Sequence, residues 1–362
     1  MRKASRMRFL AFFLSLSMLA GCSNSGASSS TSSVSSATPS ASADSAATVS
    51  SEPKAADDDA DNYPDKPIRF ILPNGAGGAM EKSSRKWQSY FEKAIGVPLQ
   101  FEFVEGSGTL IGTNVVAEAE PDGYTLLMLS GFDFCNTIAT LDAPYKLEDF
   151  DVLGINMQDP TAIMVRKDAP WNSLRELLDY MKTQPPETVS MALTNLACSD
   201  TLGVKEIEAA EGVKFNSVAF NSGSKARTAL VGGQADVGHF SLFGSQAILG
   251  DVKVLAIQTA ENPFEAYKDV PTVNKVLGKA VTDITSDYGV LAPAGFMEKY
   301  PGRAEKLINA LHAAWSDPEF VSMLEETEEN KIYNVLSSED STQYMKSLLD
   351  FVEQNKEILT GE

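Results

Sequence analysis

The sequence predicts an α/β fold built from two lobes with a ligand cleft between them. Short apolar runs of strand length alternate with longer amphipathic stretches, an order typical of a parallel sheet with helices on its faces. The alternation breaks in mid-chain and resumes after Pro170. Two similar units are therefore expected, and loops at the strand ends of each would face the other across a cleft.

The first unit starts at Lys66. Strands are expected at residues 68–72, 99–103 and 124–129. Between them, helical spacing predicts two buried helix faces, one with Trp87, Tyr90, Phe91, Ala94 and Ile95 and one with Ile111, Val115 and Ala119. Gly96 and Pro98 are expected to end the first of these helices.

The second unit repeats the pattern. A helix is marked by Leu174, Leu177, Leu178 and Met181, and further helices are expected from Thr201 and at residues 224–231. Strands are expected at residues 189–192, 215–220, 235–238 and 252–258. The tail from Pro301 is expected to be largely helical.

A secretory signal is expected at residues 1–21. Basic residues open the chain, and the apolar run at residues 9–20 is too short to cross a bilayer core of roughly 30 Å, which needs about 20 residues. Residues 19–22 read Leu-Ala-Gly-Cys and resemble the bacterial lipobox, in which the cysteine receives a diacylglyceryl group. Cys22 would then anchor the protein on the extracytoplasmic face of the cell membrane. An ordinary cleavage site beside a cysteine is the alternative.

Residues 22–62 would form the lipidated start and a tether, because this Ser- and Ala-rich stretch has too little apolar surface to fold.

The net charge of −19 argues against binding of nucleic acid and against docking on anionic lipid, because both need clustered Lys and Arg. Binding of an anion would therefore depend on the local geometry of its site.

Cys135 and Cys198 could form a disulfide in an oxidising exterior or remain two buried thiols.

Two glycine-rich turns, at residues 75–78 and 106–109, are candidate anion sites. Each connects a strand to a helix, where backbone N–H groups can approach an anion without a cationic side chain. Tight packing of strand against helix is the alternative, and neither turn has dinucleotide or phosphate-loop spacing. The sequence has two histidines, His239 and His312. It shows neither the paired Cys and His spacing of a metal site nor the nucleophile elbow of a serine hydrolase. No catalysis, metal or cofactor is expected.

Several segments together resemble the tripartite tricarboxylate transporter receptors, the TctC or Bug family. They are residues 63–69, 73–85 with the double glycine, 106–112, 117–127 with Pro-Asp-Gly-Tyr-Thr-Leu-Leu, 230–236, 269–272 and 291–295. The resemblance covers nearly all of the chain from Tyr63. It implies a periplasmic-binding-protein-like fold (type II, Venus flytrap) with a hinge near Val165 and Thr285. The implied lobes are residues 63–165 plus 286–362 for lobe 1 and 166–285 for lobe 2.

The same resemblance implies a monomeric receptor that binds a small carboxylate-bearing solute, partly through amides and ordered water, and delivers it to two integral membrane subunits. The residues expected at the ligand are Asn74, Gly75, Gly77, Gly78, Met80, Ser107, Gly108, Thr109, Ser130, Asp133, Ser199, Asp200, Thr201, Asn221, Gly223 and Asp236. Asp236 has a second interpretation, as a turn residue that holds the following strand.

The sequence departs from the family in two loops. Glu81 stands where the family usually has an aspartate, and Thr201 stands where it usually has a histidine. Three acids could add negative charge near the cleft and favour a ligand with an ammonium group, unless they lie on the surface: Asp133, Asp159 and Asp200. The nearest cations, Lys225 and Arg227, are expected on the solvated surface. A sensor that presents its ligand to a membrane kinase would share this fold, and a secreted Rossmann-like enzyme is a third hypothesis.

Overall fold

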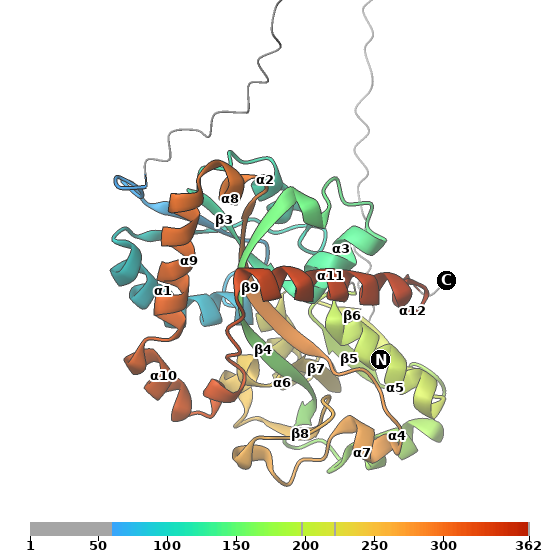
Figure 1. Cartoon of the computed structure of the whole chain (residues 1–362). Helices are drawn as coiled ribbons and strands as arrows, with labels where there is room; N and C mark the ends of the chain where they lie inside the picture. Colours follow the sequence, from blue (N-terminus) through green and yellow to red (C-terminus); the bar gives the residue numbers. More distant parts are fainter. Residues whose placement is uncertain (1–59, 197, 221, 361–362) are drawn as a thin grey trace, which may run out of the picture. The chain divides into compact units, whose positions relative to one another are not determined.

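Two long neighbouring strands connect the two halves of the structure. The computed structural model describes residues 60–196, 198–220 and 222–360. Its strands are β1 (Ile68–Leu72), β2 (Leu99–Phe103), β3 (Thr125–Ser130), β4 (Phe150–Arg166), β5 (Ser190–Leu193), β6 (Asn216–Ala219), β7 (Val237–Ser241), β8 (Val252–Ile257) and β9 (Thr285–Pro293). In Figure 1, β4 and β9 run side by side through the middle of this part of the chain.

Helices surround the strands on both sides (Figure 1). They are α1 (Ala79–Ile95), α2 (Leu110–Ala117), α3 (Gly131–Thr140), α4 (Leu174–Lys182), α5 (Ser199–Glu211), α6 (Gly223–Val231), α7 (Val273–Leu277), α8 (Phe296–Lys299), α9 (Pro301–Trp315), α10 (Pro318–Glu325), α11 (Ser338–Gln354) and α12 (Lys356–Thr360). Short 3-10 helices are η1 (Leu147–Asp149), η2 (Phe243–Ile248), η3 (Glu265–Tyr267) and η4 (Glu329–Lys331).

The strand order is β2-β1-β3-β9-β4-β7-β5-β6, and β8 also pairs with β4. On one side β1 lies parallel between β2 and β3, and on the other β5 lies parallel between β6 and β7. The first part of β4, from Phe150 to Pro160, pairs with β9, whereas Thr161 to Arg166 pairs with β7 and β8. One strand therefore belongs to both parallel units.

The two predicted parallel units are present, and β1 and β2 have their predicted bounds. The long strands β4 and β9 and helix α3 were not anticipated. A nearly continuous buried run lacks the alternation that marks a strand, and β4 also contains Gly154 and Pro160, which usually end one. Two predicted core positions are wrong: Ala94 is exposed and Ile111 is 46% exposed. Their neighbours Ile95 and Gly112 are buried, so the buried faces of α1 and α2 are narrower than the spacing predicted.

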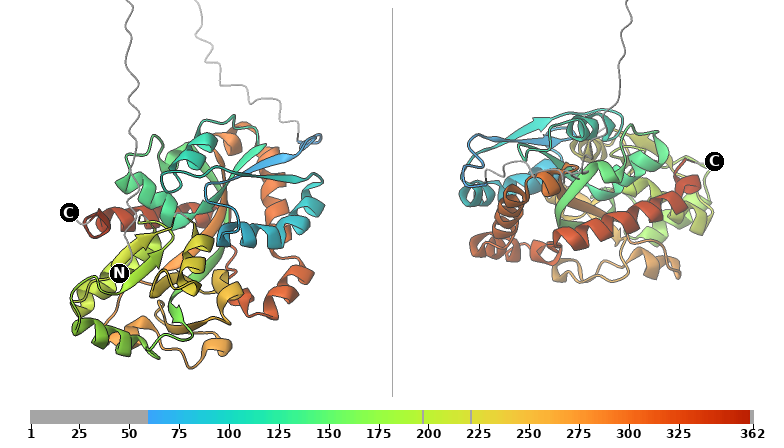
Figure 2. Two further views of the ribbon diagram at one scale, coloured as in Figure 1. Left: turned by 180° about the vertical axis from the view of Figure 1, so that it is seen from behind. Right: turned by 45° about the horizontal axis from the view of Figure 1, so that its top comes forward.

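The C-terminal helices return to the first parallel unit. Trp315 on α9 meets Trp87 on α1 edge to face, with ring centroids 6.0 Å apart. Helices α1 and α9 lie together in both views of Figure 2. Helix α11 packs against α3 and β4. This packing holds the start of α3 in place beside β9.

In the described part of the chain, no helix has the length and apolar character needed to cross a membrane. The predicted signal at residues 1–21, the predicted lipidation site Cys22 and most of the predicted tether at residues 22–62 lie outside the described residues. Cys135 and Cys198 are separate buried thiols, which decides between the two alternatives left by the sequence.

Candidate functional site

Four helix N-termini meet at one cavity of about 60 Å³, which we call the four-helix cavity. Helices α1 and α3 follow strands β1 and β3, and helices α5 and α6 follow strands β5 and β6. The carboxyl ends of these strands thus face each other from the two parallel units. The lining residues are Asn74, Gly75, Gly78, Ala79, Met80, Ser130, Asp133, Thr194, Cys198, Ser199, Asp200, Ser222, Gly223, Arg227, Phe240, Ser241, Ser286 and Tyr288.

None of these four helices has a side-chain cap. Their N-cap residues are Gly78, Ser130, Cys198 and Ser222, and none of these side chains accepts a hydrogen bond from its own first turn. Outside the cavity lining, Ser173, Thr272, Asp317 and Ser337 cap the helices α4, α7, α10 and α11, while α2, α8 and α9 also lack a side-chain cap. Uncapped N-termini leave backbone N–H donors available to an anion. The cavity is thus suited to a carboxylate.

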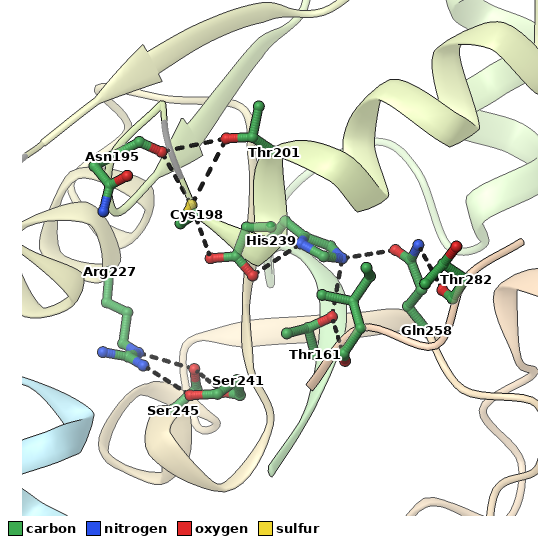
Figure 3. A network of polar contacts seen from close by, with 12 residues as sticks. Thr161, Asn195, Cys198, Thr201, Arg227, His239, Ser241, Ser245, Gln258 and Thr282 are labelled. Atoms are coloured by element: carbon green, nitrogen blue, oxygen red, sulfur yellow. Dashed lines mark hydrogen bonds and ion pairs between the residues drawn. The ribbon is translucent and has the colours of Figure 1, made fainter. Parts of the chain in front are cut away.

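Arg227 is the cation of this cavity. Its side chain is only 5% exposed, and its guanidinium lies 5.5 Å from the ring of Phe240. Nε donates to Oγ of Ser245 at 2.9 Å and Nη2 to Oγ of Ser241 at 3.2 Å, as Figure 3 shows. Nη1 has no partner among the described residues. Burial lowers the pKa of Arg227, an effect that the nearby Asp159 and Asp200 oppose.

The expected surface position of Arg227 is therefore wrong, while Lys225 is exposed as expected. The two residues lie on different sides of α6, and the Arg227 side packs on β7. Glycines make room for the guanidinium. A Cβ on Gly223 would lie 2.9 Å from Nη1, and one on Gly244 would lie 3.0 Å from Nη2.

Two acids line the same cavity. Asp133 is half-buried at the third position of α3. Burial, reinforced by Asp200, raises its pKa to about 7, against the opposing effects of hydrogen bonds from the Ser130 side chain and the Ser199 backbone. Asp200 is 6% exposed in the first turn of α5. Asp159 is fully buried but accepts the backbone N–H groups of Phe243 and Gly244 and lines a different cavity. The alternative of three surface acids is wrong.

Asp200 is paired with the buried His239, whose Nδ1 lies 3.1 Å from its Oδ1. On the other side of the ring, Nε2 lies 2.9 Å from Oε1 of Gln258 (Figure 3). The Gln258 amide nitrogen donates to the Thr282 carbonyl, so Oε1 faces the ring and can only accept. Nε2 of the ring therefore donates to Gln258, and Nδ1 faces the Asp200 carboxyl group.

Of the residues predicted at the ligand, nine line the four-helix cavity: Asn74, Gly75, Gly78, Met80, Ser130, Asp133, Ser199, Asp200 and Gly223. Ser107 and Gly108 line an adjoining cavity of about 280 Å³ that shares Asn74, Gly75 and Thr194 with it. The second glycine turn thus lies next to the first.

Five predicted residues are placed differently. Gly77 donates its N–H to Oε2 of Glu81, and Thr109 is buried beside Thr137. Thr201 donates to the Asn195 carbonyl. Asp236 accepts from the amide and hydroxyl of Ser190, which agrees with its interpretation as a turn residue. Asn221 lies outside the described residues.

The prediction missed the other lining residues, which are Ala79, Thr194, Cys198, Ser222, Arg227, Phe240, Ser241, Ser286 and Tyr288. Arg227 carried a usable signal, because it follows the start of a helix by one turn. Ser286 and Tyr288 carried none, since they reach the cavity from β9, far along the chain.

A larger cavity of about 400 Å³ lies on the other side of Ala79. Lys86 there is paired with Glu329, and the carboxylate of Asp159 already accepts two amides. Lys82, a further charged residue of this lining, is exposed, unlike the buried Arg227. Within the described residues, no cluster of His, Cys, Asp and Glu could hold a metal ion.

Comparison with known proteins gives one consistent result. Residues 84–361 match the model of the tripartite tricarboxylate transporter family receptor. The chain is 26% identical over 283 residues to a UPF0065 protein of Bordetella pertussis, covering 77% of this chain and 85% of that relative. It is similar in structure to the periplasmic binding protein BugD, with a TM-score of 0.73 at 24% identity over 82% of this chain and 98% of BugD.

MatC from Rhodopseudomonas palustris, solved with bound malate, is also similar, with a TM-score of 0.71 at 22% identity over 82% of this chain and 100% of MatC. The predicted two-lobed, periplasmic-binding-protein-like α/β fold is confirmed. The prediction of a binding protein rather than an enzyme is confirmed as well. The chain belongs to the tripartite tricarboxylate transporter receptors, the TctC or Bug family of extracytoplasmic solute-binding proteins.

Proposed function

We propose that this protein captures a small carboxylate-bearing solute in the four-helix cavity and delivers it to the two integral membrane subunits of a tripartite transporter. The observation that carries the proposal is the unpartnered Nη1 of Arg227 in a cavity bordered by four uncapped helix N-termini. A carboxylate would accept hydrogen bonds from both kinds of donor. The malate in MatC is a ligand of this chemical class.

The proposed lobes are residues 63–165 plus 286–362 and residues 166–285, with β4 and β9 as the hinge. A cavity of about 60 Å³ is much smaller than the roughly 300–1,000 Å³ of a typical ligand pocket. Solute entry would therefore require the lobes to separate. Strands that continue from one lobe into the other can allow such a movement by bending at a few residues.

We propose that Cys22 is lipidated after removal of residues 1–21 and that the tether holds a monomeric receptor outside the membrane. The proposed location is the extracytoplasmic face of the cell membrane. A flexible tether would let the receptor reach the transporter subunits.

Calorimetry of the purified receptor with mono-, di- and tricarboxylates tests the binding proposal. We expect at least one carboxylate to bind and the replacement Arg227→Met to abolish that binding. Transport is tested separately by uptake of the bound solute in cells with and without the receptor gene. A receptor whose loss leaves uptake unchanged would contradict delivery to a transporter.

A further inference from the structure

Two opposite charges that form no ion pair face the same cavity. Arg227 hydrogen-bonds to the neutral hydroxyls of Ser241 and Ser245, and no ion pair of the described residues includes it. Asp133 likewise has no cationic partner within 4.0 Å in the described part of the chain. Each charge therefore lacks a counterion that a bound molecule could supply.

Arg227 favours an anionic group on the ligand. A buried guanidinium nitrogen without an acceptor is unfavourable, because folding removes its water without replacing the hydrogen bond. Nη1 is in that position, on a side chain that is 5% exposed and lines the cavity. A carboxylate is the group that best satisfies a guanidinium.

Asp133 favours a cationic group on the ligand. An acid in the first turn of a helix is favourable by itself, so its position on α3 alone requires no ligand. The surroundings of Asp133 add the second observation. Asp200, Asp287, Cys198 and Tyr288 are the titratable groups that face it, and Arg227 is the cation of the cavity. A second carboxylate of a ligand placed here would meet like charge.

Asp200, the second acid of the lining, is already engaged by a basic side chain. Its Oδ1 lies 3.1 Å from Nδ1 of His239, so Asp133 is the lining acid that no basic side chain of the described residues contacts, and Arg227 is the cation without an acid. A dicarboxylate would satisfy Arg227 and oppose Asp133. A simple amine would satisfy Asp133 and leave Arg227 without a partner.

We propose that the solute is a small zwitterion, an amino acid, whose carboxylate binds Arg227 and the uncapped helix N-termini and whose ammonium group binds Asp133. This inference rests on the proposed function and narrows its ligand class. The burial of both groups makes the pair selective, because a ligand that lacks either charge leaves a desolvated group unpaired.

The test is calorimetry of the purified protein with matched probes. The zwitterions are alanine, β-alanine, 4-aminobutanoate and aspartate. The carboxylates without an amine are propionate, succinate and malate, and the amines without a carboxylate are propylamine and 1,4-diaminobutane. We expect a zwitterion to bind at least about tenfold more tightly than its matched carboxylate or amine.

Variants test whether Asp133 is the residue that binds the ammonium group of the ligand. Asp133→Asn keeps the size of the side chain and is expected to weaken zwitterion binding at least about tenfold while carboxylate binding stays the same or improves. The matched control is Asp350→Asn, an exposed acid on α11, which should change neither. Thermal unfolding without ligand shows whether each variant is folded, and Asp133→Ser serves as a second variant if Asp133→Asn is not.

The outcomes separate the two proposals. If succinate or malate binds tightly and no zwitterion binds, the zwitterion inference is overturned, while the proposed function as a carboxylate receptor is retained. Zwitterion binding that Asp133→Asn leaves unchanged would also overturn the inference. If none of the carboxylate-bearing probes binds, with or without an amine, and a retained non-acidic molecule is recovered by mass spectrometry, the proposed function itself fails.

Discussion

His239 Nδ1 lies 3.1 Å from Asp200 Oδ1, and neither side chain has appreciable contact with solvent. The pair joins the first turn of α5 to strand β7. Through Gln258 and Thr161 the same ring also contacts the end of β8 and the middle of β4. The position of one cavity acid is therefore coupled to three strands of the second parallel unit.

Replacing His239 should destabilise the protein more than replacing both members of the pair. His239→Asn leaves the buried Asp200 carboxyl group without its imidazole partner, which typically costs about 1–3 kcal/mol. The double variant with Asp200→Asn removes the unsatisfied carboxyl group and should recover part of the loss. Urea unfolding of the two single variants and the double variant measures the coupling. Strictly additive losses would show that the two side chains do not interact.

Arg227→Met should remove ligand binding without unfolding the protein. The apolar side chain fills a similar volume beside Phe240, and no ion pair is broken. Loss of a buried charge-assisted contact should weaken binding by about 2–5 kcal/mol.

The matched control is Lys225→Met, two residues earlier on α6 and exposed, which should bind like the wild type. Both are measured as the ligand-induced rise in melting temperature. Equal rises in the two variants would contradict the assignment of Arg227.

Gly244→Ala should weaken binding while leaving every charge in place. A Cβ there would lie 2.3 Å from Oγ of Ser241, 2.8 Å from Cβ of Ala79 and 3.0 Å from Nη2 of Arg227. The guanidinium and its serine partner would have to shift, at a cost of about 1–3 kcal/mol. Gly250→Ala, where a Cβ meets nothing within 4 Å, is the control. Calorimetry of both variants should show weaker binding only for Gly244→Ala.

Asp159 should make stability depend on pH. Burial raises its pKa to about 7, against the opposing effects of the Phe243 and Gly244 amides and of Arg227, while Glu329 adds to the rise. A raised pKa means that the folded state binds the proton more tightly than the unfolded state. The stabilising contribution is thus full below about pH 4 and is lost as pH rises through 7.

The comparison with Asp159→Asn isolates this effect. The wild type should lose stability relative to the variant as pH rises from about 4 to about 7, and the difference should level off above that range. Urea unfolding at several pH values measures it. A difference that stays constant over this range would show that Asp159 does not titrate there.

Cys22→Ser should release the protein from the membrane. The thiol is the proposed attachment point of the lipid, so its loss should move the receptor from the membrane fraction to the soluble extracytoplasmic fraction. Radiolabelled palmitate should be incorporated by the wild type and not by the variant. A Cys22→Ser protein that stays in the membrane fraction with its label would contradict the proposed anchor.

The sequence by itself determined the family and most of the strands and helices of the two parallel units, but not β4, β9 or α3. Local spacing was enough for β1 and β2, and glycine-rich segments correctly marked where strands give way to helices. It also identified nine of the cavity residues, because these lie where a strand gives way to the first turn of the following helix.

Only the tertiary structure decided which of these groups meet and which charges remain unpaired. The burial of Arg227 depends on β7 and η2, which follow it in the chain, and Asp200 meets His239 across 39 positions. Ser286 and Tyr288 reach the cavity from β9, whose pairing with β3 and β4 is non-local. Periodicity reports which face of an element is buried, whereas a counterion depends on contacts between elements that local sequence does not encode.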